Sequence, residues 1–337
     1  MISASQGQAK LANAPLVSIR NLVVDYVVEN GYLRAVDGVS FDVMPGEILG
    51  LAGESGSGKS TVASAMMRLI EPPSKVAGEI MWGRSNLLRL NSQQVREYRW
   101  RLISMVFQGA MNSLDPVFTV SSQIEETIRA HDSRATREDA RRRALELLGK
   151  VGIDPLRADD YPHQLSGGMR QRVMIAMSLA LKPRLLIADE PTSALDVVTQ
   201  RQIVELLHQL QMEYNLSVIF ITHDLPLLST ICDRMAVMHR GRIVEMGEHD
   251  EVFSSPKHPY TELLLSSVPS LSRKAPVQLT GGETQELDVK GEGCRFFMHC
   301  PIHTDACKKI DPKLLPVSGS KSQSVACIRR DGASASS

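Results

Sequence analysis

The sequence predicts an α/β protein with a doubly wound core, and two observations lead to that prediction. A glycine-rich loop, Gly53–Thr61, joins a short apolar run to a helical segment. Short apolar runs then alternate with helical segments as far as residue 222, which is the element order of a mostly parallel sheet covered by helices. A chain of 337 residues has room for one large domain or two modest ones.

The glycine loop carries the clearest chemical signal. It follows Ile48–Ala52, an apolar run that predicts a buried strand, and precedes Val62–Ile70, which predicts a helix because it lacks Gly and Pro. The loop matches G-x-x-x-x-G-K-[ST], which binds phosphate in this strand–helix context. Glycines let backbone N–H groups converge on an anion, and the helix N-terminus adds partial positive charge. The alternative is a glycine turn with a solvated lysine.

Each loop residue has an expected role. Lys59 is expected to reach the outer phosphates of a nucleotide, and the Ser60 hydroxyl is expected to bind Mg²⁺. The residues expected to bind nucleotide here are Gly53, Ser55, Gly56, Ser57, Gly58, Lys59, Ser60 and Thr61.

The remaining elements are predicted from apolar patterning. Strands are expected at Val17–Val28 and Arg34–Val43, which are separated by the turn Glu29-Asn30-Gly31, and then at Val76–Trp82, Met105–Phe107, Leu185–Ala188 and Val218–Ile221. Helices are expected within Thr119–Lys150, over Met169–Leu181, and over Gln200–Met212 as a crossover between the last two strands. After about Ser266 the composition shifts to Pro, Gly, Ser and charged residues, so we place a domain boundary there.

Charge and termini exclude several classes of protein. Lys plus Arg and Asp plus Glu both number 38, so net charge gives no reason to expect a nucleic-acid partner. Residues 1–14 are small and polar, which predicts a disordered tail and no signal peptide. No apolar stretch approaches the roughly 18 residues of a membrane span. We therefore expect a soluble, cytoplasmic chain whose membrane association comes through a partner.

Two adjacent carboxylates end the apolar run Leu185–Ala188. Asp189 can hold Mg²⁺, directly or through water, and Glu190 can polarise an attacking water. The alternative for this pair is a helix N-cap. If Asp189 and Glu190 have these roles, the run Leu185–Ala188 is the strand that accompanies a phosphate-binding loop in nucleotide hydrolases.

With these motifs the chain resembles an ATP-binding subunit of an ABC transporter. Leu165-Ser166-Gly167-Gly168-Met169 is similar to the signature LSGGQ of that family, with Met in the last place. Further family positions are matched, in family order, by Tyr26 (adenine stacking), Gln108 (a glutamine after a strand), Ser193-Ala194-Leu195-Asp196 (the D-loop) and His223 (the switch histidine). Tyr26 and His223 also fit an ordinary core aromatic and a core histidine.

The resemblance implies a fold and a division of the chain. It implies a P-loop NTPase core of the RecA-like type, an N-terminal antiparallel β subdomain, a helical subdomain that carries the signature, and a small cysteine-containing C-terminal extension. We expect the nucleotide-binding domain at residues 15–265, its helical subdomain at about 109–180, and the extension at 266–337.

The resemblance also implies a mechanism that needs two cassettes. ATP with Mg²⁺ would be held between the phosphate loop of one chain and Ser166, Gly167 and Gly168 of another. In that scheme Glu190 orients or deprotonates the water, His223 contacts the γ-phosphate, and Gln108 senses Mg²⁺ and the membrane subunit. Asp196 would belong to the same nucleotide site.

Two segments narrow the cargo through resemblance. Phe107–Pro116 is similar to the Phe-Gln-Asp-Pro-Met-x-Ser-Leu-Asn-Pro segment of dipeptide and oligopeptide importers, with Gly109-Ala110 in place of Asp-Pro. Its residues Met111 and Leu114, with Phe118 just beyond, suit docking of a membrane-subunit helix or local packing. Pro256-Lys257-His258-Pro259-Tyr260-Thr261, followed by a cysteine-bearing tail, is similar to the C-terminal extension of the same importers.

Four cysteines lie in that tail: Cys294, Cys300, Cys307 and Cys327. In a reducing compartment they suit metal ligation better than disulfides, and they lack the paired C-x2-C usual for structural zinc. A four-cysteine set suits a [4Fe–4S] cluster, which some members of the subfamily carry. Zinc with His299 or His303, and unmetallated thiols or disulfides, stay open. The lone Cys232 suits a buried small hydrophobe.

These observations predict the ATP-hydrolysing subunit of a peptide importer at the cytoplasmic face of the cell membrane. Its expected partners are a second ATPase subunit of the same or a sister kind, two transmembrane permease subunits and an extracytoplasmic substrate-binding protein. The alternatives are another cargo such as nickel, glutathione or oligosaccharide, a soluble ABC ATPase without a membrane partner, and an iron–sulfur redox protein with an accessory nucleotide site.

Overall fold

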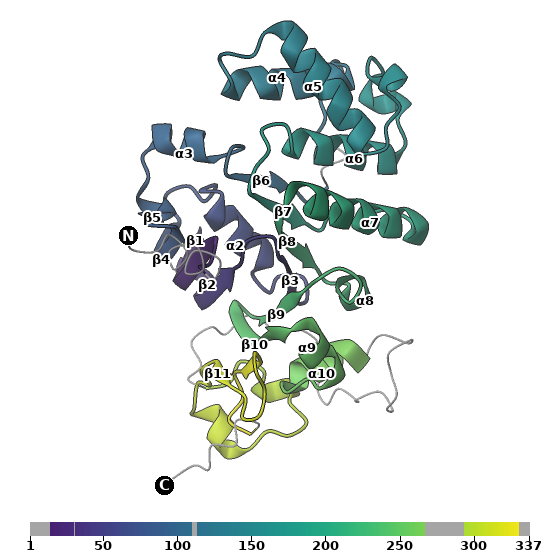
Figure 1. Cartoon of the computed structure of the whole chain (residues 1–337). Helices are drawn as coiled ribbons and strands as arrows, with labels where there is room; N and C mark the ends of the chain where they lie inside the picture. The colour runs from purple at the N-terminus through teal and green to yellow at the C-terminus, as the bar shows by residue number, and fades with distance from the viewer. Residues whose placement is uncertain (1–13, 30, 110–112, 267–292, 330–337) are drawn as a thin grey trace, which may run out of the picture. The chain divides into compact units, whose positions relative to one another are not determined.

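The computed structural model of this chain describes residues 14–29, 31–109, 113–266 and 293–329 (Figure 1). The chain divides into two compact units. The first unit comprises residues 1–43, 49–88 and 222–337, and the second comprises residues 44–48 and 89–221. The expected disordered tail lies outside the described residues, apart from Ala14.

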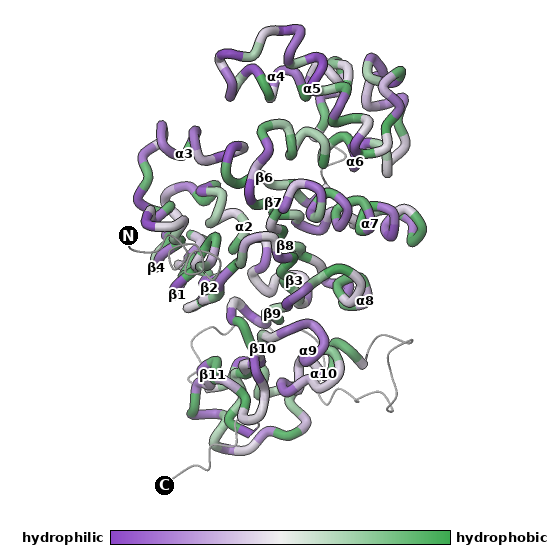
Figure 2. The backbone as a smooth tube through the Cα atoms, viewed as in Figure 1, coloured by the Kyte–Doolittle hydropathy of each residue, from purple (hydrophilic) through white to green (hydrophobic). Residues whose placement is uncertain are grey.

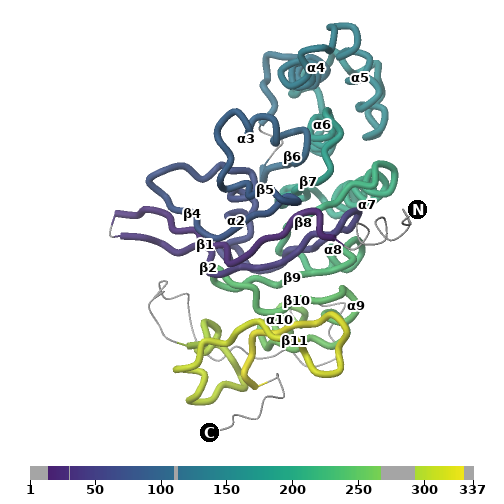
Figure 3. The backbone as a smooth tube through the Cα atoms, turned by 60° about the vertical axis from the view of Figure 1, so that its left-hand side comes forward, coloured from purple at the N-terminus to yellow at the C-terminus, as the bar shows by residue number. Residues whose placement is uncertain are grey.

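An antiparallel sheet in the first unit confirms the predicted N-terminal β subdomain. Its strands are β1 (Val17–Val28), β2 (Gly31–Val43), β4 (Lys75–Trp82) and β5 (Ser85–Asn86), in the order β2-β1-β4-β5. The long pair β1–β2 stands out in Figure 3, and its register sets Val17 opposite Val43 and Tyr26 opposite Leu33. Alternate side chains of β1, such as Val17, Ile19, Leu22 and Val24, are buried.

The second set of strands in the first unit runs β11-β12-β10-β9-β3. Their bounds are β3 (Ile48–Ala52), β9 (Arg234–His239), β10 (Arg242–Glu248), β11 (Leu315–Pro316) and β12 (Ser324–Val325). β3 pairs parallel with β9, and the pairs β9–β10, β10–β12 and β11–β12 are antiparallel. Every residue of β3 is buried, as its continuous apolar run predicts. Strands β9 to β12 were not predicted from the sequence.

The helices of the first unit are short. They are α2 (Lys59–Met66), α8 (Leu225–Leu228), α9 (His249–Ser254) and α10 (Pro259–Ser266), with 3-10 turns at Phe297–His299 and Asp305–Lys308. α2 begins at Lys59 instead of the predicted Val62, because Gly58 at a φ of 103° is its N-cap. The helix ends at Met66, before the predicted end at Ile70, and Arg68 just beyond it adopts a left-handed φ of 54°.

The second unit contains the parallel strands predicted around the crossover helix. Their order is β8 (Ser217–Thr222), β7 (Leu185–Asp189) and β6 (Ile103–Val106), and all their residues are buried. α7 (Val197–Tyr214) is the crossover between β7 and β8, and it alternates hydrophilic and hydrophobic stretches in Figure 2. The α/β fold class is therefore confirmed.

The helical part of the second unit holds α3 (Ser92–Tyr98), α4 (Val120–His131), α5 (Arg137–Lys150) and α6 (Gly167–Ser178). Short 3-10 turns of this unit lie at Pro155–Arg157 and Pro162–Gln164, and another lies at Leu87–Arg89, where the chain passes from the first unit to the second. The single helical pattern predicted over Thr119–Lys150 forms two helices, because Thr119 and Thr136 each cap a separate N-terminus. Among the described residues, no helix is both long and apolar enough to cross a bilayer.

A buried carboxylate holds the chain after β10 against that strand. Glu245 is fully buried, and its two oxygens accept hydrogen bonds from the backbone N–H groups of Lys257 (2.7 Å) and His258 (2.9 Å). The side-chain amide of Gln323 donates to it as well, at 2.7 Å. Burial raises the pKa of Glu245, and these hydrogen bonds act against that rise. The carboxylate therefore ties β10, the start of α10 and the C-terminal region together.

An ion network joins β2, β10 and the C-terminal region. Asp37 on β2 accepts from Arg242 Nη2 at 2.6 Å, from Arg34 Nη1 at 3.3 Å, and from Arg295. Burial by itself would raise the pKa of Asp37, but the hydrogen bond and charge of Arg242, with the charges of Arg295 and Arg34, hold it below its usual value. Asp37 thus pairs with arginines from three segments that are distant in sequence.

Asp37→Asn is expected to lower the free energy of unfolding by about 1–3 kcal/mol at neutral pH, because three arginines lose a shared carboxylate. A lowered folded-state pKa stabilises above the unfolded value near 3.9 and is lost as pH falls through the folded value, so the deficit should shrink below about pH 4. Urea unfolding across pH tests this, with the exposed Asp305→Asn as control. A deficit that stays constant down to pH 2 would contradict it.

Candidate functional site

The lysine of the glycine loop is buried and held by the loop itself. Lys59 is 4% exposed, and its Nζ donates to the carbonyl oxygens of Gly53 and Glu54, both at 2.8 Å, and to Ser57 Oγ at 3.2 Å. The ammonium therefore lies inside the turn and not in solvent. This burial contradicts the alternative of a glycine turn with a solvated lysine. A buried ammonium ringed by oxygens is a preformed position for an anion to share.

Two glycines of the loop are required by close packing. Gly53 has a φ of 147°, and a Cβ there would lie 2.3 Å from the carbonyl oxygen of Met238 on β9. Gly58 has a φ of 103°, and a Cβ there would lie 2.5 Å from the carbonyl oxygen of Ala35 on β2. Both positions need a residue without a side chain. The loop rests against β2 and β9, while Ser55, Gly56 and Ser60 are exposed and Thr61 is half-buried.

In the second unit, the acidic end of β7 lies beside the predicted glutamine. Asp189 is buried at the end of the strand, and Glu190 follows with a left-handed φ of 45°. The backbone N–H of Glu190 donates to Ile221 O at 2.9 Å, which fixes it against β8. Gln108 Nε2 donates to Glu190 Oε2 at 3.0 Å. The structure thus brings together Gln108 and Glu190, which are 82 positions apart.

The signature and the D-loop also meet within this unit. Ser166 is the N-cap of α6, and its side chain accepts from Met169 N at 3.3 Å. Asp196 is the N-cap of α7 and accepts from both the N–H and the hydroxyl of Thr199, at 3.0 and 2.6 Å. A Cβ at Gly168 would lie 2.5 Å from Thr199 Cγ2. Asp196 therefore orients the threonine against which the signature glycine packs, and sequence reasoning did not single out Thr199.

The hydrogen bonds from Thr199 lower the pKa of Asp196, with lesser help from neighbouring backbone N–H groups. The carboxylate therefore stays ionised at the start of α7. Gly167 and Gly168 form the first turn of α6, where backbone N–H groups without helical partners can face an anion.

Two further predicted site residues, Tyr26 and His223, lie in the first unit. Tyr26 is a half-buried residue of β1 opposite Leu33. His223 is exposed and directly follows β8. Asp224, the next residue, caps α8 through Leu227 N at 3.2 Å, so the segment that carries His223 has a fixed start.

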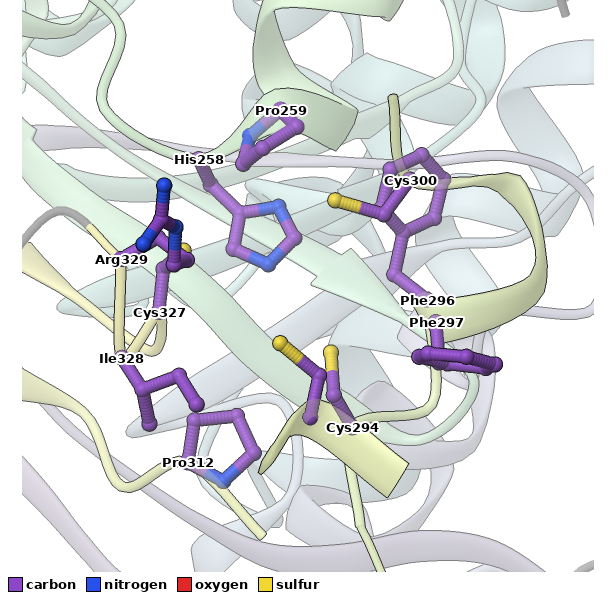
Figure 4. Close-up of a pocket in the computed structure, with 11 residues that line it drawn as sticks. His258, Pro259, Cys294, Phe296, Phe297, Cys300, Pro312, Cys327, Ile328 and Arg329 are labelled. Atoms are coloured by element: carbon purple, nitrogen blue, oxygen red, sulfur yellow. The ribbon is translucent and has the colours of Figure 1, made fainter. Parts of the chain in front are cut away.

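The four C-terminal cysteines line one pocket. Cys294, Cys300, Cys307 and Cys327 surround it together with His258, Phe296 and Phe297 (Figure 4). Cys294 N donates to Cys307 O at 2.8 Å, which closes the loop that carries three of them. All five cysteines of the chain lie among the described residues, and no disulfide joins them. Cys232 is buried apart from this pocket, near Gly50.

The thiols influence one another. Burial raises the pKa of Cys294 to about 11, and the neighbouring Cys300, Cys307 and Cys327 add to the rise. Four thiolates could share this pocket only with a cation to offset their charge. Among the described residues, no three Cys, His, Asp or Glu side chains are arranged around the position of a single metal ion. His303, one of the histidines considered for zinc, contacts Cys300 O through Nδ1 at 2.6 Å.

Family models match both parts of the chain. The model described as ABC transporter matches residues 36–193, and the model described as oligopeptide/dipeptide transporter, C-terminal region, matches residues 244–307. A protein of Brucella abortus (strain 2308) named for peptide import and ATP binding is 45% identical over 306 residues, which is 90% of this chain and 92% of that protein.

The chain belongs to the ABC transporter family. The dipeptide transport ATP-binding protein DppD of Haemophilus influenzae is 44% identical to this ABC protein, and the match covers 89% of this chain and 92% of DppD. Among solved structures, the dimeric ATP-binding cassette MJ0796 bound to ADP and Pi is 31% identical with a TM-score of 0.62, covering 69% of this chain and 98% of its own. The predicted cassette fold and ATPase class are confirmed.

Gly53→Ala is expected to destabilise this ABC protein by about 2–4 kcal/mol, because the added Cβ collides with a strand carbonyl at a φ that Ala rarely adopts. Gly38→Ala is the matched control, since it also has a positive φ (71°) but no atom within 4 Å of its Cβ. Only the strain of a left-handed residue, about 1–2 kcal/mol, is expected there. Chemical unfolding measures both, and equal losses would contradict the packing argument.

Proposed function

We propose that this protein is the ATP-hydrolysing subunit of a peptide importer and couples ATP binding and hydrolysis to uptake of dipeptides or oligopeptides. One observation carries the proposal: a single chain contains both a cassette and the C-terminal region described for oligopeptide/dipeptide transporters. Relatives named for dipeptide transport match it over 89% of its length at 42–44% identity.

The nucleotide contacts follow from the loop geometry. Lys59 exchanges its contacts to loop carbonyls for the outer phosphates, so the buried charge is never without oxygen partners. The backbone N–H groups around Gly56 and Gly58 surround the phosphates, and Tyr26 stacks on adenine. At an effective dielectric of about 20, one lysine about 4 Å from one phosphate charge contributes roughly 4 kcal/mol.

Hydrolysis is assigned to the acid–amide pair of the second unit. Glu190 orients or deprotonates the attacking water, and His223 contacts the γ-phosphate. The 3.0 Å hydrogen bond from Gln108 supports this assignment, because it holds the Glu190 carboxylate in place. Because the NH₂ group of Gln108 makes the hydrogen bond to Glu190, its amide oxygen is the atom that can bind a cation. The Ser60 hydroxyl, the Gln108 oxygen and the Asp189 carboxylate are the oxygens that would hold Mg²⁺, which offsets phosphate charge when bound.

Two cassettes are proposed to share each nucleotide. The signature residues Ser166, Gly167 and Gly168 contact the phosphates bound by the partner's loop, with Asp196 at the same interface. Exposed apolar residues support an interface here, because Val197 and Val198, directly after Asp196, are 80% and 68% exposed. The partner is a second copy or a sister ATPase.

The remaining proposed partners are two transmembrane permeases and an extracytoplasmic binding protein, which would hold this chain peripherally at the cytoplasmic face of the membrane. Around the Gln108 segment, Phe107, Val117 and Phe118 are 42%, 70% and 51% exposed and can accept a permease helix. Leu114 is buried, so it packs locally, and Met111 lies outside the described residues.

Glu190→Gln is expected to keep the ATP affinity within about twofold while ATP turnover falls at least about 100-fold, because the amide cannot take a proton from water. Uptake of a labelled dipeptide by cells that carry the complete transporter should fall with it. Glu205→Gln, an exposed change on α7, is the control and should keep both activities. If the Glu190 variant hydrolyses ATP at the wild-type rate, Glu190 does not activate the attacking water. If the wild-type transporter takes up no peptide, the proposed peptide cargo is wrong.

We further propose that the four-cysteine pocket holds a [4Fe–4S] cluster with a stabilising role. Four thiols around one pocket are the donor set that such a cluster uses. The four thiols would hold the cluster, which would stabilise this part of the chain when bound.

Protein purified without oxygen is expected to show broad visible absorption and about four irons per chain. Cys300→Ala should lower the iron content, because Cys300 lines the pocket. Cys232→Ala should not, since Cys232 is buried elsewhere and its pKa of about 12 disfavours a thiolate. A colourless, iron-free wild type would contradict the cluster, and zinc in its place would favour the other metal.

A further inference from the structure

A side chain of α10 reaches the glycine loop that is proposed to bind phosphate. Tyr260 lies in the first turn of α10, about 200 positions beyond the loop, and is 1% exposed. The backbone N–H of Glu54 donates a hydrogen bond to the Tyr260 hydroxyl oxygen at 3.0 Å. Both residues belong to the first unit.

This hydrogen bond holds one side of a peptide group whose other side is held by Lys59. The peptide group between Gly53 and Glu54 donates through its N–H to Tyr260 and accepts through the Gly53 carbonyl from Lys59 Nζ at 2.8 Å. A peptide group that is bound at both ends cannot rotate without breaking a hydrogen bond. The start of the loop is thereby oriented.

Tyr260 is itself fixed by residues from several segments of the first unit. Its ring lies 4.3 Å from that of His239 and 5.5 Å from that of Phe296, centroid to centroid. Its backbone N–H donates to His258 Nδ1 at 3.1 Å, and the N–H of His258 donates to the buried Glu245 at 2.9 Å. A continuous series of contacts therefore leads from β10 through α10 to the loop.

The hydroxyl is suited to a permanent contact. Burial raises the pKa of Tyr260, so the phenol keeps its proton and its oxygen accepts the Glu54 N–H throughout the physiological range. Its ring cannot swing away, because His239 and Phe296 pack on it.

We propose that Tyr260 is a positioning residue for nucleotide binding: it orients the Gly53–Glu54 peptide group so that the phosphate loop keeps its shape when Lys59 turns to the ligand. Lys59 is the group that must share its protons with phosphate, and the loop carbonyls then lose part of that hold. The Tyr260 contact has no such competition. The inference rests on the proposed nucleotide-binding function and adds that α10, which lies within the residues matched by the C-terminal family model, contributes to ATP affinity.

Tyr260→Phe in the full chain isolates the hydroxyl, because the ring and its packing remain. The dissociation constant for the Mg²⁺ complex of a non-hydrolysable ATP analogue, measured by calorimetry, is expected to rise about threefold to tenfold. Tyr98→Phe is the matched control: Tyr98 is a buried tyrosine of α3 in the second unit, and its variant should bind like the wild type. Melting temperatures without nucleotide are recorded for all three proteins.

The outcomes separate a positioning role from a structural one. A Tyr260→Phe protein that melts earlier but binds the analogue as tightly as the wild type overturns the inference. A wild type that does not bind the analogue at all overturns the proposed function, and the inference with it. Hydrogen exchange at the Glu54 amide decides the matter if the variant does not fold: slow exchange in the wild type supports the contact, and the rate of an unstructured amide overturns it.

Discussion

The buried ammonium of Lys59 is the constraint on which the phosphate loop depends. A cation with 4% exposure is stable only where oxygens replace water, and the loop supplies the Gly53 and Glu54 carbonyls and Ser57 Oγ. Those oxygens converge because the chain turns tightly against β2 and β9, which leaves room for glycine alone at Gly53 and Gly58. The turn, the glycines and the lysine therefore require one another.

The proposed positioning role of Tyr260 links α10 to the same loop. The start of the loop is oriented through Tyr260, and Tyr260 is fixed through His258 and the buried Glu245. Phe296 lines the cysteine pocket and packs on Tyr260, which is the residue that contacts the loop. The residues that the C-terminal family model matches, 244–307, thus include the side chain that contacts this loop.

Two carboxylates of the second unit, Glu190 and Asp196, are held by uncharged hydrogen-bond donors. Glu190 is held by an amide, Gln108, which stabilises a carboxylate without neutralising it. Asp196 accepts two hydrogen bonds from Thr199 at the N-terminus of α7, where the helix dipole favours an anion. The proposed role of Glu190 is to act on water, whereas the salt bridge between Asp37 and Arg242 serves stability.

The sequence by itself determined the class of fold, the phosphate loop, the signature and the family, because each depends on local spacing: Gly53 to Thr61, or an apolar run that ends at Asp189. It missed β9, β10 and the break between α4 and α5, where capping residues such as Thr136 override a continuous helical pattern. Only the tertiary structure decided which distant residues meet: Gln108 with Glu190, Thr199 with Gly168, and Tyr260 with Glu54. Such contacts arise from packing between elements, and no periodicity along the chain records them.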